Sequence, residues 1–377
     1  MRVLHIITDF DDGGAQAVLC RFVTADRNNE HQVISLMDIG AYGERLLAVG
    51  IKVHSLGMPK SRLTIAGVVK LYQLIRQIDA DIIQTWMYHS DFIGSIIARI
   101  AGKKAVVWGI HNTNLDPDKT STSTRAIVRA CGLLSKTLPL KIVSCSQEGV
   151  KVHTALGYQS QKMVVIPNGY DISEFSPQPD SRQQLRALWQ IPENTTLFGM
   201  VARWNPQKDH ANLIAALAEL RSRVQSPWHC VTIGSNMSED NQVLLDLLDR
   251  AGIRDRVTLL GIRTDIPAVM SALDFHVLSS AYGEAFPNVV AEAMACETPC
   301  IVTEVGDSAL IVGDTGWVVP SSDPAGLATA MAAAIGELSN RTALAQRQTN
   351  CRERIEANFN LQIMIDRYKD LWASCIV

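Results

Sequence analysis

The chain alternates short apolar segments with amphipathic helical segments, and this alternation starts twice. The segments expected to be strands in the first half are Val3–Ile7, Val33–Leu36, Lys52–His54, Ile82–Thr85, Ala105–His111, Lys141–Ser144 and Met163–Ile166. In the second half they are Leu197–Val201, Cys230–Ile233, Val257–Leu260, Phe275–Leu278, Pro299–Val302 and Trp317–Val319. Strands that alternate with helices form parallel sheets covered on both faces. The sequence therefore predicts the α/β class, with two sheets.

The length of 377 residues agrees with two domains, since one domain usually holds about 100–200 residues. The stretch 171–180, rich in Pro, Ser and Asp, separates the two series of strands. We expect a first domain over residues 1–175 and a second over residues 176–356. Ligands of open parallel sheets bind beyond the carboxyl ends of the strands, so two facing domains would enclose a cleft between their loops.

The composition, with 47% hydrophobic and 19% charged residues, is typical of a globular protein. No apolar run approaches the roughly 20 residues needed to span a bilayer, and the opening Arg2–Ile7 is too short for a signal peptide. The eight cysteines are scattered, without the paired spacing of a zinc site. We therefore expect a cytoplasmic protein with reduced thiols.

The segment Glu284–Ala295 combines an anion-binding helix start with two carboxylates. Pro287 suits the first turn of a helix, so the backbone amides of Asn288, Val289 and Val290 are expected at its N-terminus, where unpaired donors favour an anion. Glu284 then lies before the helix and Glu292 within it. An anion flanked by groups that bind hydroxyls suggests a sugar nucleotide. Taken alone, the segment would be better explained as a surface helix with two solvated glutamates.

Two cations and a glycine pair extend this pattern. Arg203 and Lys208 follow the first strand of the second domain, where fixed positive charge could stabilise a departing diphosphate. Gly13 and Gly14 follow the first strand of the chain and open a helix, where glycine lets the backbone approach a phosphate or sugar. The alternatives are solvated loop cations and a plain tight turn. The spacing G-x-G-x-x-G is absent, which argues against a dehydrogenase.

Several segments in the right order resemble the motifs of the retaining glycosyltransferases of family 4, over nearly the whole chain. They are Asp12-Gly13-Gly14-Ala15, Ile166-Pro167-Asn168-Gly169-Tyr170-Asp171, Val201-Ala202-Arg203-Trp204-Asn205-Pro206-Gln207-Lys208-Asp209, Ala272-Leu273-Asp274, Glu284–Ala295 and Val302-Thr303-Glu304-Val305-Gly306-Asp307. The resemblance implies the GT-B architecture, which has two facing Rossmann-like domains and a cleft between them. It also implies that a C-terminal crossover helix, within residues 357–377, completes the first domain.

The resemblance implies a role for several residues. Glu292 would hold the ribose hydroxyls of the donor, and Glu284 would lie beside the transferred sugar. His111, at the end of a strand, would contact the donor sugar and phosphate. Arg263, in the segment Gly261–Asp265, lies where the family seats the nucleotide base. Gln16 stands where the family commonly has Glu, and Gly234-Ser235-Asn236 departs from the usual Gly-x-Gly-Pro.

No metal site and no cofactor are expected. Asp9-Phe10-Asp11 and Asp116-Pro117-Asp118 both spell the Asp-x-Asp signature of a different transferase fold. Such short acidic pairs arise often by chance, and the first lies in the glycine loop. Arg203 and Lys208 would supply the positive charge that a divalent ion supplies elsewhere.

A membrane surface is a further possible partner. Residues 1–175 hold 19 basic and 15 acidic side chains, whereas the remainder hold 16 and 23. The segment Thr122–Leu138 has basic and apolar faces and could lie on anionic lipid, although a packed surface helix would show the same pattern. We expect a cytoplasmic protein that could contact the inner face of the cell membrane, and no nucleic-acid partner.

Together these features predict a retaining, metal-independent glycosyltransferase. It would move a hexose from a nucleotide sugar, with UDP favoured, to a glycan or lipid-linked oligosaccharide in cell-surface polysaccharide biosynthesis. The alternatives are a sugar-nucleotide epimerase or phosphorylase of the same fold, and a sugar-nucleotide-binding protein without catalysis.

Overall fold

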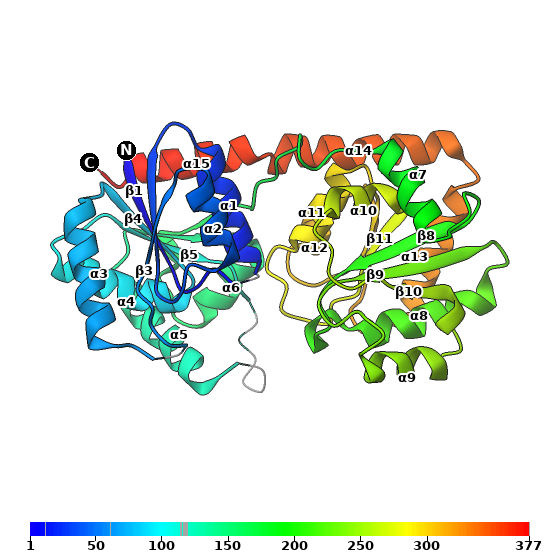
Figure 1. Ribbon diagram of the computed structural model, residues 1–377, viewed down its shortest axis with the longest axis horizontal. Helices are drawn as coiled ribbons and strands as arrows, with labels where there is room; N and C mark the ends of the chain where they lie inside the picture. The colour runs from blue at the N-terminus through cyan, green and yellow to red at the C-terminus, as the bar shows by residue number, and fades with distance from the viewer. Residues whose placement is uncertain (12, 61, 114, 116–119, 377) are drawn as a thin grey trace. The chain divides into compact units, whose positions relative to one another are not determined.

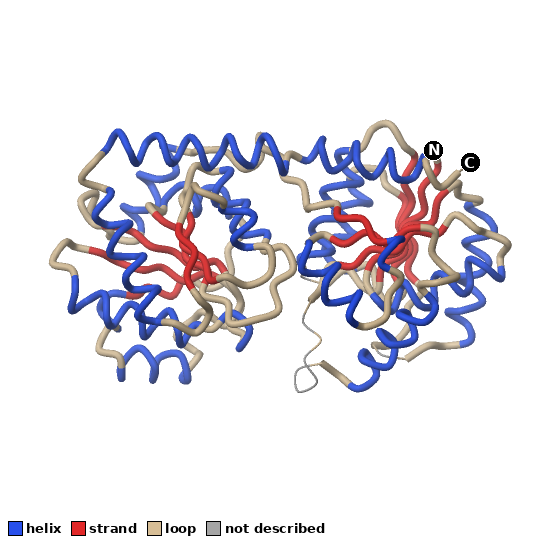
Figure 2. Tube along the Cα trace, turned by 180° about the vertical axis from the view of Figure 1, so that it is seen from behind, coloured by secondary structure: helices blue, strands red, loops and turns tan. Residues whose placement is uncertain are grey.

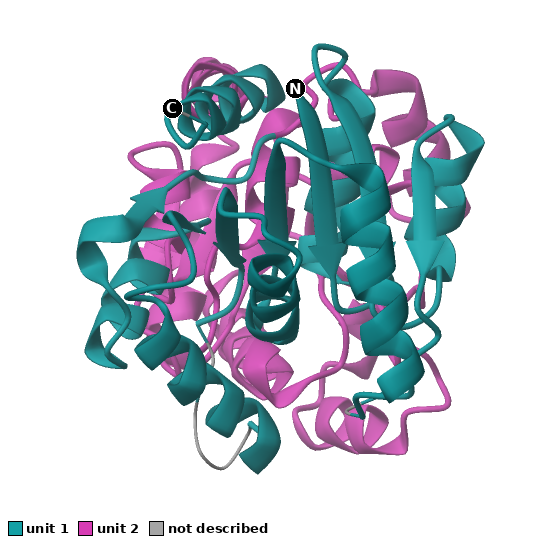
Figure 3. Ribbon diagram, turned by 90° about the vertical axis from the view of Figure 1, so that its left-hand side faces the viewer, with its two compact units in different colours: residues 1–169, 361–377 teal, residues 170–360 magenta. Residues whose placement is uncertain are grey.

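The computed structural model describes residues 1–11, 13–60, 62–113, 115 and 120–376. Contacts between Cα atoms divide the chain into two compact units, coloured separately in Figure 3. Unit 1 comprises Met1–Gly169 and Leu361–Val377, and unit 2 comprises Tyr170–Asn360.

Unit 1 is built on a seven-stranded parallel sheet of order β3-β2-β1-β4-β5-β6-β7. Its strands are β1 (Arg2–Ile7), β2 (Glu30–Ser35), β3 (Lys52–Ser55), β4 (Ile82–Trp86), β5 (Val106–Ile110), β6 (Lys141–Ser144) and β7 (Met163–Val165). Its helices are α1 (Gly14–Ala25), α2 (Gly40–Ala48), α3 (Ile65–Ile78), α4 (Tyr88–Ile100), α5 (Thr122–Leu134), α6 (Gln147–Ala155) and α15 (Leu361–Ala373). Side chains of α3, α4 and α5 contribute to one apolar core of unit 1, and those of α1, α2 and α15 contribute to the other. Figure 1 labels these helices around the sheet.

Unit 2 is built on a six-stranded parallel sheet of order β10-β9-β8-β11-β12-β13. Its strands are β8 (Thr196–Val201), β9 (Trp228–Ile233), β10 (Val257–Leu259), β11 (Phe275–Leu278), β12 (Cys300–Thr303) and β13 (Trp317–Val319). Its helices are α7 (Pro179–Leu188), α8 (His210–Arg223), α9 (Gln242–Arg250), α10 (Ile266–Ala272), α11 (Asn288–Ala295), α12 (Ser308–Val312), α13 (Pro324–Glu337) and α14 (Arg341–Phe359). Figure 2 shows helices on both sides of each sheet. The predicted class of two Rossmann-like α/β sheets is confirmed.

The last helix of the chain belongs to unit 1, although more than 180 residues of unit 2 precede it. Leu361, Met364 and Tyr368 of α15 lie in the apolar core of unit 1. The indole Nε1 of Trp372 donates to Oε1 of Gln84 on β4 at 3.1 Å. The crossover helix implied by the family resemblance is therefore present.

The structure places the unit boundaries at 169/170 and 360/361, whereas the sequence pattern suggests 175/176 and 356/357. Residues 170–175 contact unit 2: the hydroxyl of Tyr170 donates to Asn288 Oδ1 at 2.6 Å, and the guanidinium of Arg352 donates to the carbonyls of Ile172 and Phe175. The Pro/Ser/Asp-rich composition of 171–180 marks a change of local structure. It does not show to which core the segment is attached.

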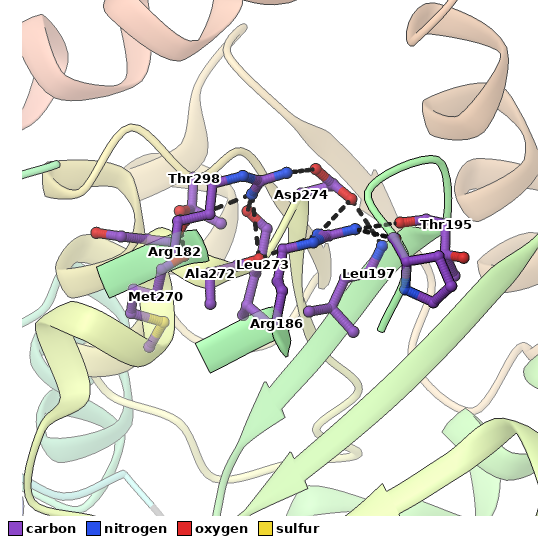
Figure 4. Close-up of polar contacts among 11 residues, drawn as sticks. Arg182, Arg186, Thr195, Leu197, Met270, Ala272, Leu273, Asp274 and Thr298 are labelled. Atoms are coloured by element: carbon purple, nitrogen blue, oxygen red, sulfur yellow. Dashed lines mark hydrogen bonds and ion pairs between the residues drawn. The ribbon is translucent and has the colours of Figure 1, made fainter. Parts of the chain in front are cut away.

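A partly buried ionic cluster fixes α7 to the start of β11 (Figure 4). Asp274 accepts from Arg182 at 2.6 Å, from Arg186 at 3.3 Å and from the backbone N–H of Leu197 at 2.7 Å. Arg186 is buried and also donates to the carbonyls of Ala272, Pro192 and Thr195. The carboxylate thus joins α7, β8 and β11, and the Ala272-Leu273-Asp274 motif has a structural role here.

Within the part of the chain that the structure describes, no helix is long and apolar enough to cross a bilayer.

Candidate functional site

The carboxyl end of the unit 2 sheet holds a buried ion pair between Lys208 and Glu284. The Lys208 ammonium lies 2.5 Å from Glu284 Oε1, and the hydroxyl of Ser280 donates to the same oxygen at 2.6 Å. The side chains of Lys208 and Glu284 are 16% and 8% exposed. A charged pair so little exposed is stable only where each charge is offset, and here the lysine, the serine and the carboxylate satisfy one another.

The backbone around this pair is held by hydrogen bonds between the loops that follow β8, β11 and β12. Asn205 caps the turn Pro206–Lys208 by accepting from the N–H of Gln207 at 2.9 Å. The side-chain amide of Gln207 donates to the carbonyl of Gly283 at 3.0 Å, and Thr303 donates to the carbonyl of Ser280 at 2.6 Å. Because β8, β11 and β12 are neighbours in the sheet, their carboxyl ends bring these loops together.

Gly306 is required by this arrangement. Its φ is +59°, and a Cβ atom there would lie 2.0 Å from the carbonyl oxygen of Glu284. No side chain can be accommodated at that distance, so glycine allows the loop after β12 to pass against the backbone that carries Glu284. The segment Val302–Asp307 therefore supports Glu284.

Arg203 lies close in sequence to Lys208 but in a different environment. Its side chain is exposed and has no ion pair with a described residue. Its backbone is fixed, because its carbonyl accepts from Nε2 of His210 at 3.1 Å and the neighbouring Trp204 stacks on the His210 ring. Gly234, with φ +145°, packs so closely on the Ala202 carbonyl that a Cβ would come within 2.4 Å of it. The backbone of Arg203 is thus fixed, whereas its guanidinium group is exposed.

Helix α11 begins at Asn288, as the position of Pro287 predicts. The side chain of Asn288 accepts from the hydroxyl of Tyr170 at 2.6 Å, and Val289 is half-buried. The N–H of Val290 donates to the carbonyl of Pro287 at 3.1 Å, so it is already used within the first turn. This differs from the expectation of three outward amides, because the tight first turn forms its own hydrogen bond. Glu292 is half-buried in the middle of the helix.

Arg263 does not carry an unpaired charge. Its guanidinium donates through Nε to Asp265 Oδ1 at 2.8 Å and pairs through its terminal nitrogen with Oδ2. The same group lies over the ring of Trp189, 5.6 Å from the centroid. For the expected contact with a nucleotide, the guanidinium would bind while still paired with Asp265, or it would leave Asp265 for the nucleotide. The preceding Gly261, with φ +65°, bonds through its backbone to Gly234 and Met237.

In unit 1, the glycine loop precedes α1. Gly13 is the N-cap of the helix, and a Cβ there would lie 2.3 Å from Oε1 of Gln16. The Gln16 amide donates to Asp9 Oδ1 at 2.8 Å, so the amide that replaces the family's glutamate binds an aspartate of the same loop. Gly14 is the exposed first residue of α1. Asp12, the first residue of this motif, lies outside the described residues.

His111 follows β5 in unit 1 and is stacked on Trp86, with ring centroids 5.0 Å apart and planes inclined by 19°. Neither of its ring nitrogens has a hydrogen-bond partner among the described residues, although both are buried. Burial lowers the pKa of His111 to about 4. The imidazole is therefore neutral near pH 7 and offers one donor and one acceptor.

Some residues of this site were not predicted from the sequence. Ser280 hydrogen-bonds Glu284, Trp86 stacks on His111, and Tyr170 bonds Asn288. Ser280 and Trp86 both lie at the carboxyl end of a strand, and this is the signal that could have identified them. Among the described residues, no three His, Cys, Asp or Glu side chains gather as a metal site, and Asp116-Pro117-Asp118 lies outside those residues.

Two family models match the chain. The model described as "Glycosyltransferase Family 4" matches residues 12–174, and the model described as "Glycosyl transferases group 1" matches residues 195–337.

Two curated relatives illustrate the similarity. The UDP-Gal:alpha-D-GlcNAc-diphosphoundecaprenol alpha-1,3-galactosyltransferase of Escherichia coli is 25% identical over 320 residues, which cover 82% of this chain and 79% of the relative. The D-inositol 3-phosphate glycosyltransferase of Salinispora arenicola is 30% identical over 200 residues, which cover 49% of this chain and 44% of that protein.

Solved structures show the same fold. The structure of Anabaena HepE in complex with UDP superposes with a TM-score of 0.86 at 23% identity and covers 99% of this chain and 100% of its own. Its complex with UDP-glucose superposes with a TM-score of 0.85 over the same shares of the two chains.

Proposed function

The chain belongs to family 4 of the glycosyltransferases, and we propose that it transfers a hexose from a nucleotide sugar, with retention of the anomeric configuration, to a glycan or lipid-linked oligosaccharide. The observation that carries this proposal is the buried Lys208–Glu284 pair at the carboxyl end of the unit 2 sheet. Such pairs cost solvation, so an ion pair retained where ligands of this fold bind favours a role in chemistry.

UDP is the proposed nucleotide. HepE is known in complexes with UDP and UDP-glucose, and the Escherichia coli relative is named for UDP-Gal, so the names of two similar proteins point to the same nucleotide. Glu292 would bind the ribose hydroxyls, and the segment around Gly261 would meet the base. Gly13 and Gly14 would lie against the donor sugar or phosphate.

Lys208 and Glu284 would exchange partners when the donor binds. A diphosphate carries more negative charge than one carboxylate and would compete for the Lys208 ammonium, with Arg203 as a second cation. Glu284 would then be released toward the sugar, where a carboxylate stabilises positive charge at the anomeric carbon. As the glycosidic bond breaks, negative charge grows on the bridging oxygen and the two cations stabilise it. We propose that these cations remove the need for a divalent metal.

His111 would act as a neutral group beside the donor sugar. Its two buried nitrogens could donate one hydrogen bond and accept another from sugar hydroxyls or the acceptor. Retention would follow from attack on the same face from which the diphosphate leaves. The leaving phosphate would take the acceptor proton, and no protein nucleophile is needed.

The acceptor is proposed to be lipid-linked, and unit 1 to contact anionic lipid. The exposed residues of α5 are mostly small or polar (Thr122, Ser123, Ala126, Arg129 and Leu133), whereas Ile127, Val128 and Leu134 pack into the core. The N-terminal turn of α3 is more apolar at its surface: Leu63 is 53%, Ile65 87% and Val69 48% exposed.

The charge of residues 57–78, which include α3, also favours binding to anionic lipid. Residues 57–78 contain Lys60, Arg62, Lys70 and Arg76, all exposed, and no acidic residue. Apolar side chains beside unopposed basic charge bind surfaces of anionic lipid. Sedimentation with phosphatidylglycerol vesicles should exceed that with phosphatidylcholine vesicles and fall with salt. Ile65→Asp should weaken it, whereas Val243→Asp on α9 of unit 2 should not; equal sedimentation with both lipids would contradict this part of the proposal.

Donor binding and turnover test the proposed function directly. Because a ligand that binds only the folded state raises its stability, thermal melts with UDP-, GDP- and ADP-hexoses should identify the nucleotide. Release of the nucleoside diphosphate from that donor, accelerated by a lipid-linked acceptor, is the expected result. Tight binding without any release would support a non-catalytic binder. Conversion of the sugar without release of the nucleoside diphosphate would support an epimerase.

A further inference from the structure

Four buried side chains of unit 1 form a continuous chain of hydrogen bonds that ends beneath His111. The indole Nε1 of Trp86 lies 3.1 Å from Nδ1 of His5, and Nε2 of His5 lies 2.9 Å from Nδ1 of His31. Nε2 of His31 lies 3.0 Å from Oδ2 of Asp26. The chain crosses three neighbouring strands of the sheet, since β2, β1 and β4 are adjacent.

The chemistry of the four groups fixes the position of every proton. An indole N–H can only donate, so Nδ1 of His5 must accept and its proton must be on Nε2. His5 then donates to Nδ1 of His31, which places the proton of His31 on its own Nε2, where it is donated to Asp26. An added proton on either imidazole would set two N–H groups against each other somewhere along the chain. The bond to Trp86 is therefore complete only while both histidines are neutral.

The surroundings maintain this state. The rings of Phe22 and Trp372 contact both imidazoles, and Tyr368 packs against those two rings. Burial lowers the pKa of both His5 and His31. At the other end, Asp26 also accepts from the backbone N–H of Asn28 at 2.9 Å and from the Asn29 amide at 2.7 Å. Burial raises the pKa of Asp26, but these hydrogen bonds and His31 outweigh it and hold the pKa below its usual value. The chain ends on an ionised acceptor.

His111 itself is held by no hydrogen bond to a described residue through its ring. Its stacking partner is Trp86, from the end of the adjacent strand β4, and the indole lies nearly parallel to the imidazole. Among the described residues, this stack fixes the plane of the imidazole and leaves both ring nitrogens without a hydrogen-bond partner.

We propose that Trp86 is a positioning residue for His111, and that the chain from Asp26 through His31 and His5 fixes the indole in the orientation this requires. The inference rests on the proposed function, in which His111 contacts the donor sugar. A reacting group displaced by about 1 Å can lose up to roughly 100-fold in rate. A ring that stacking holds, without a hydrogen bond from any described residue, therefore needs a rigid support.

A second tryptophan provides a matched control. Trp108 on β5 is as fully buried as Trp86, and its indole N–H donates to the hydroxyl of Ser95 at 2.5 Å. It lies in the other core of unit 1, which contains α3, α4 and α5. Trp86→Phe and Trp108→Phe therefore remove the same atoms and one buried hydrogen bond each, but only the first alters the support of His111.

Kinetics of the full-length variants test the proposal. Trp86→Phe should lower kcat roughly 10- to 100-fold with a smaller change in the donor KM, whereas Trp108→Phe should stay within about twofold of wild type at a similar loss of thermal stability. His5→Leu keeps the indole but removes its acceptor, and should also lower kcat. His5→Gln supplies one acceptor and one donor and should recover part of the loss. Equal losses in the two tryptophan variants, or full kcat in His5→Leu, would overturn the proposal.

NMR spectra of protein labelled with ¹⁵N in its histidine rings give a test that does not depend on activity. His5 and His31 should both appear as neutral Nε2–H tautomers at pH 7.5, and the His111 resonances, assigned from His111→Gln, should shift in Trp86→Phe and His5→Leu but not in Trp108→Phe. Another tautomer for either histidine, or His111 resonances that do not shift, would refute the proposal that the hydrogen-bond chain and Trp86 position His111. A wild-type protein that shows these tautomers and shifts but transfers no sugar would instead refute the proposed function.

Discussion

At the scale of single residues, the central feature is that Lys208 and Glu284 neutralise each other. The motifs around them predict two separate roles, one at the diphosphate and one at the sugar. The pair would connect these roles, because a donor that takes the lysine would also release the carboxylate. Removal of either group should therefore affect the transition state more than the ground state.

Substitution of the pair should reduce kcat. Lys208→Ala is expected to lower kcat by about 100-fold, because charge on the leaving diphosphate grows only as the bond breaks. Glu284→Gln keeps the shape and the hydrogen bond from Ser280 but loses the charge, and it should lower kcat more than donor affinity. Steady-state kinetics with calorimetric donor binding measure both effects; an unchanged kcat in Lys208→Ala or full activity in Glu284→Gln would refute these roles.

Glu292 should behave differently from Glu284. If it binds the ribose equally in ground and transition states, Glu292→Ala should raise the donor KM and leave kcat nearly unchanged, because uniform binding does not alter the chemical barrier. Glu356, an exposed residue of helix α14, offers a matched control, and Glu356→Ala should change neither parameter. A drop in kcat at unchanged KM for Glu292→Ala would move this residue into the catalytic step.

At the scale of elements, the sequence predicts the strands well and the contacts between them poorly. Strands such as β1 and β8 are dense in apolar residues and bounded by polar loops, so their positions can be read locally. The sheet order brings β1 next to β4 and β8 next to β11, and no local signal encodes it. The pairing of Arg263 with Trp189 and the chain from Asp26 to Trp86 depend on that order, and so they were not predicted.

The ionic cluster of Asp274, Arg182 and Arg186, which fixes α7 to the start of β11, should contribute strongly to the stability of unit 2. Asp274→Ala leaves the buried Arg186 without its opposite charge and the Leu197 N–H without its acceptor, which should cost about 3–5 kcal/mol. Asp246→Ala removes an exposed carboxylate 3.9 Å from Arg250 and should change stability by less than about 0.5 kcal/mol. Denaturant unfolding of the two full-length variants measures the difference between their free energies of unfolding. Similar unfolding midpoints would mean that the ionic cluster contributes little.

At the scale of the whole molecule, the histidines share one property. The sequence has nine, and burial lowers the pKa of each. A histidine whose folded pKa lies below its unfolded value of about 6.5 contributes its full stability above that pH. The contribution is lost as the pH falls from about 6.5 toward the folded pKa. Asp91 opposes this trend, because burial raises its pKa well above the usual value.

The protein should therefore lose stability steeply on mild acidification. His111, His153 and His276 have pKa values near 4, 4 and 3, so each should cost about 2 kcal/mol between pH 6.5 and pH 5. Thermal melts at constant ionic strength from pH 7.5 to pH 5 should show a falling Tm, most steeply below pH 6.5. A constant Tm over this range would show that these histidines are accessible to protons in the folded state.

The most direct test of the account is the stereochemistry of the product formed without metal. A reaction of the protein with a UDP-α-hexose and a lipid-linked sugar acceptor, in the presence of EDTA, can be followed by proton NMR at the anomeric position. We predict release of UDP together with an α-linked product, because the cations of unit 2 stabilise the leaving group and attack occurs on the face from which it departs. A β-linked product, or transfer that requires Mn²⁺ or Mg²⁺, would contradict the account.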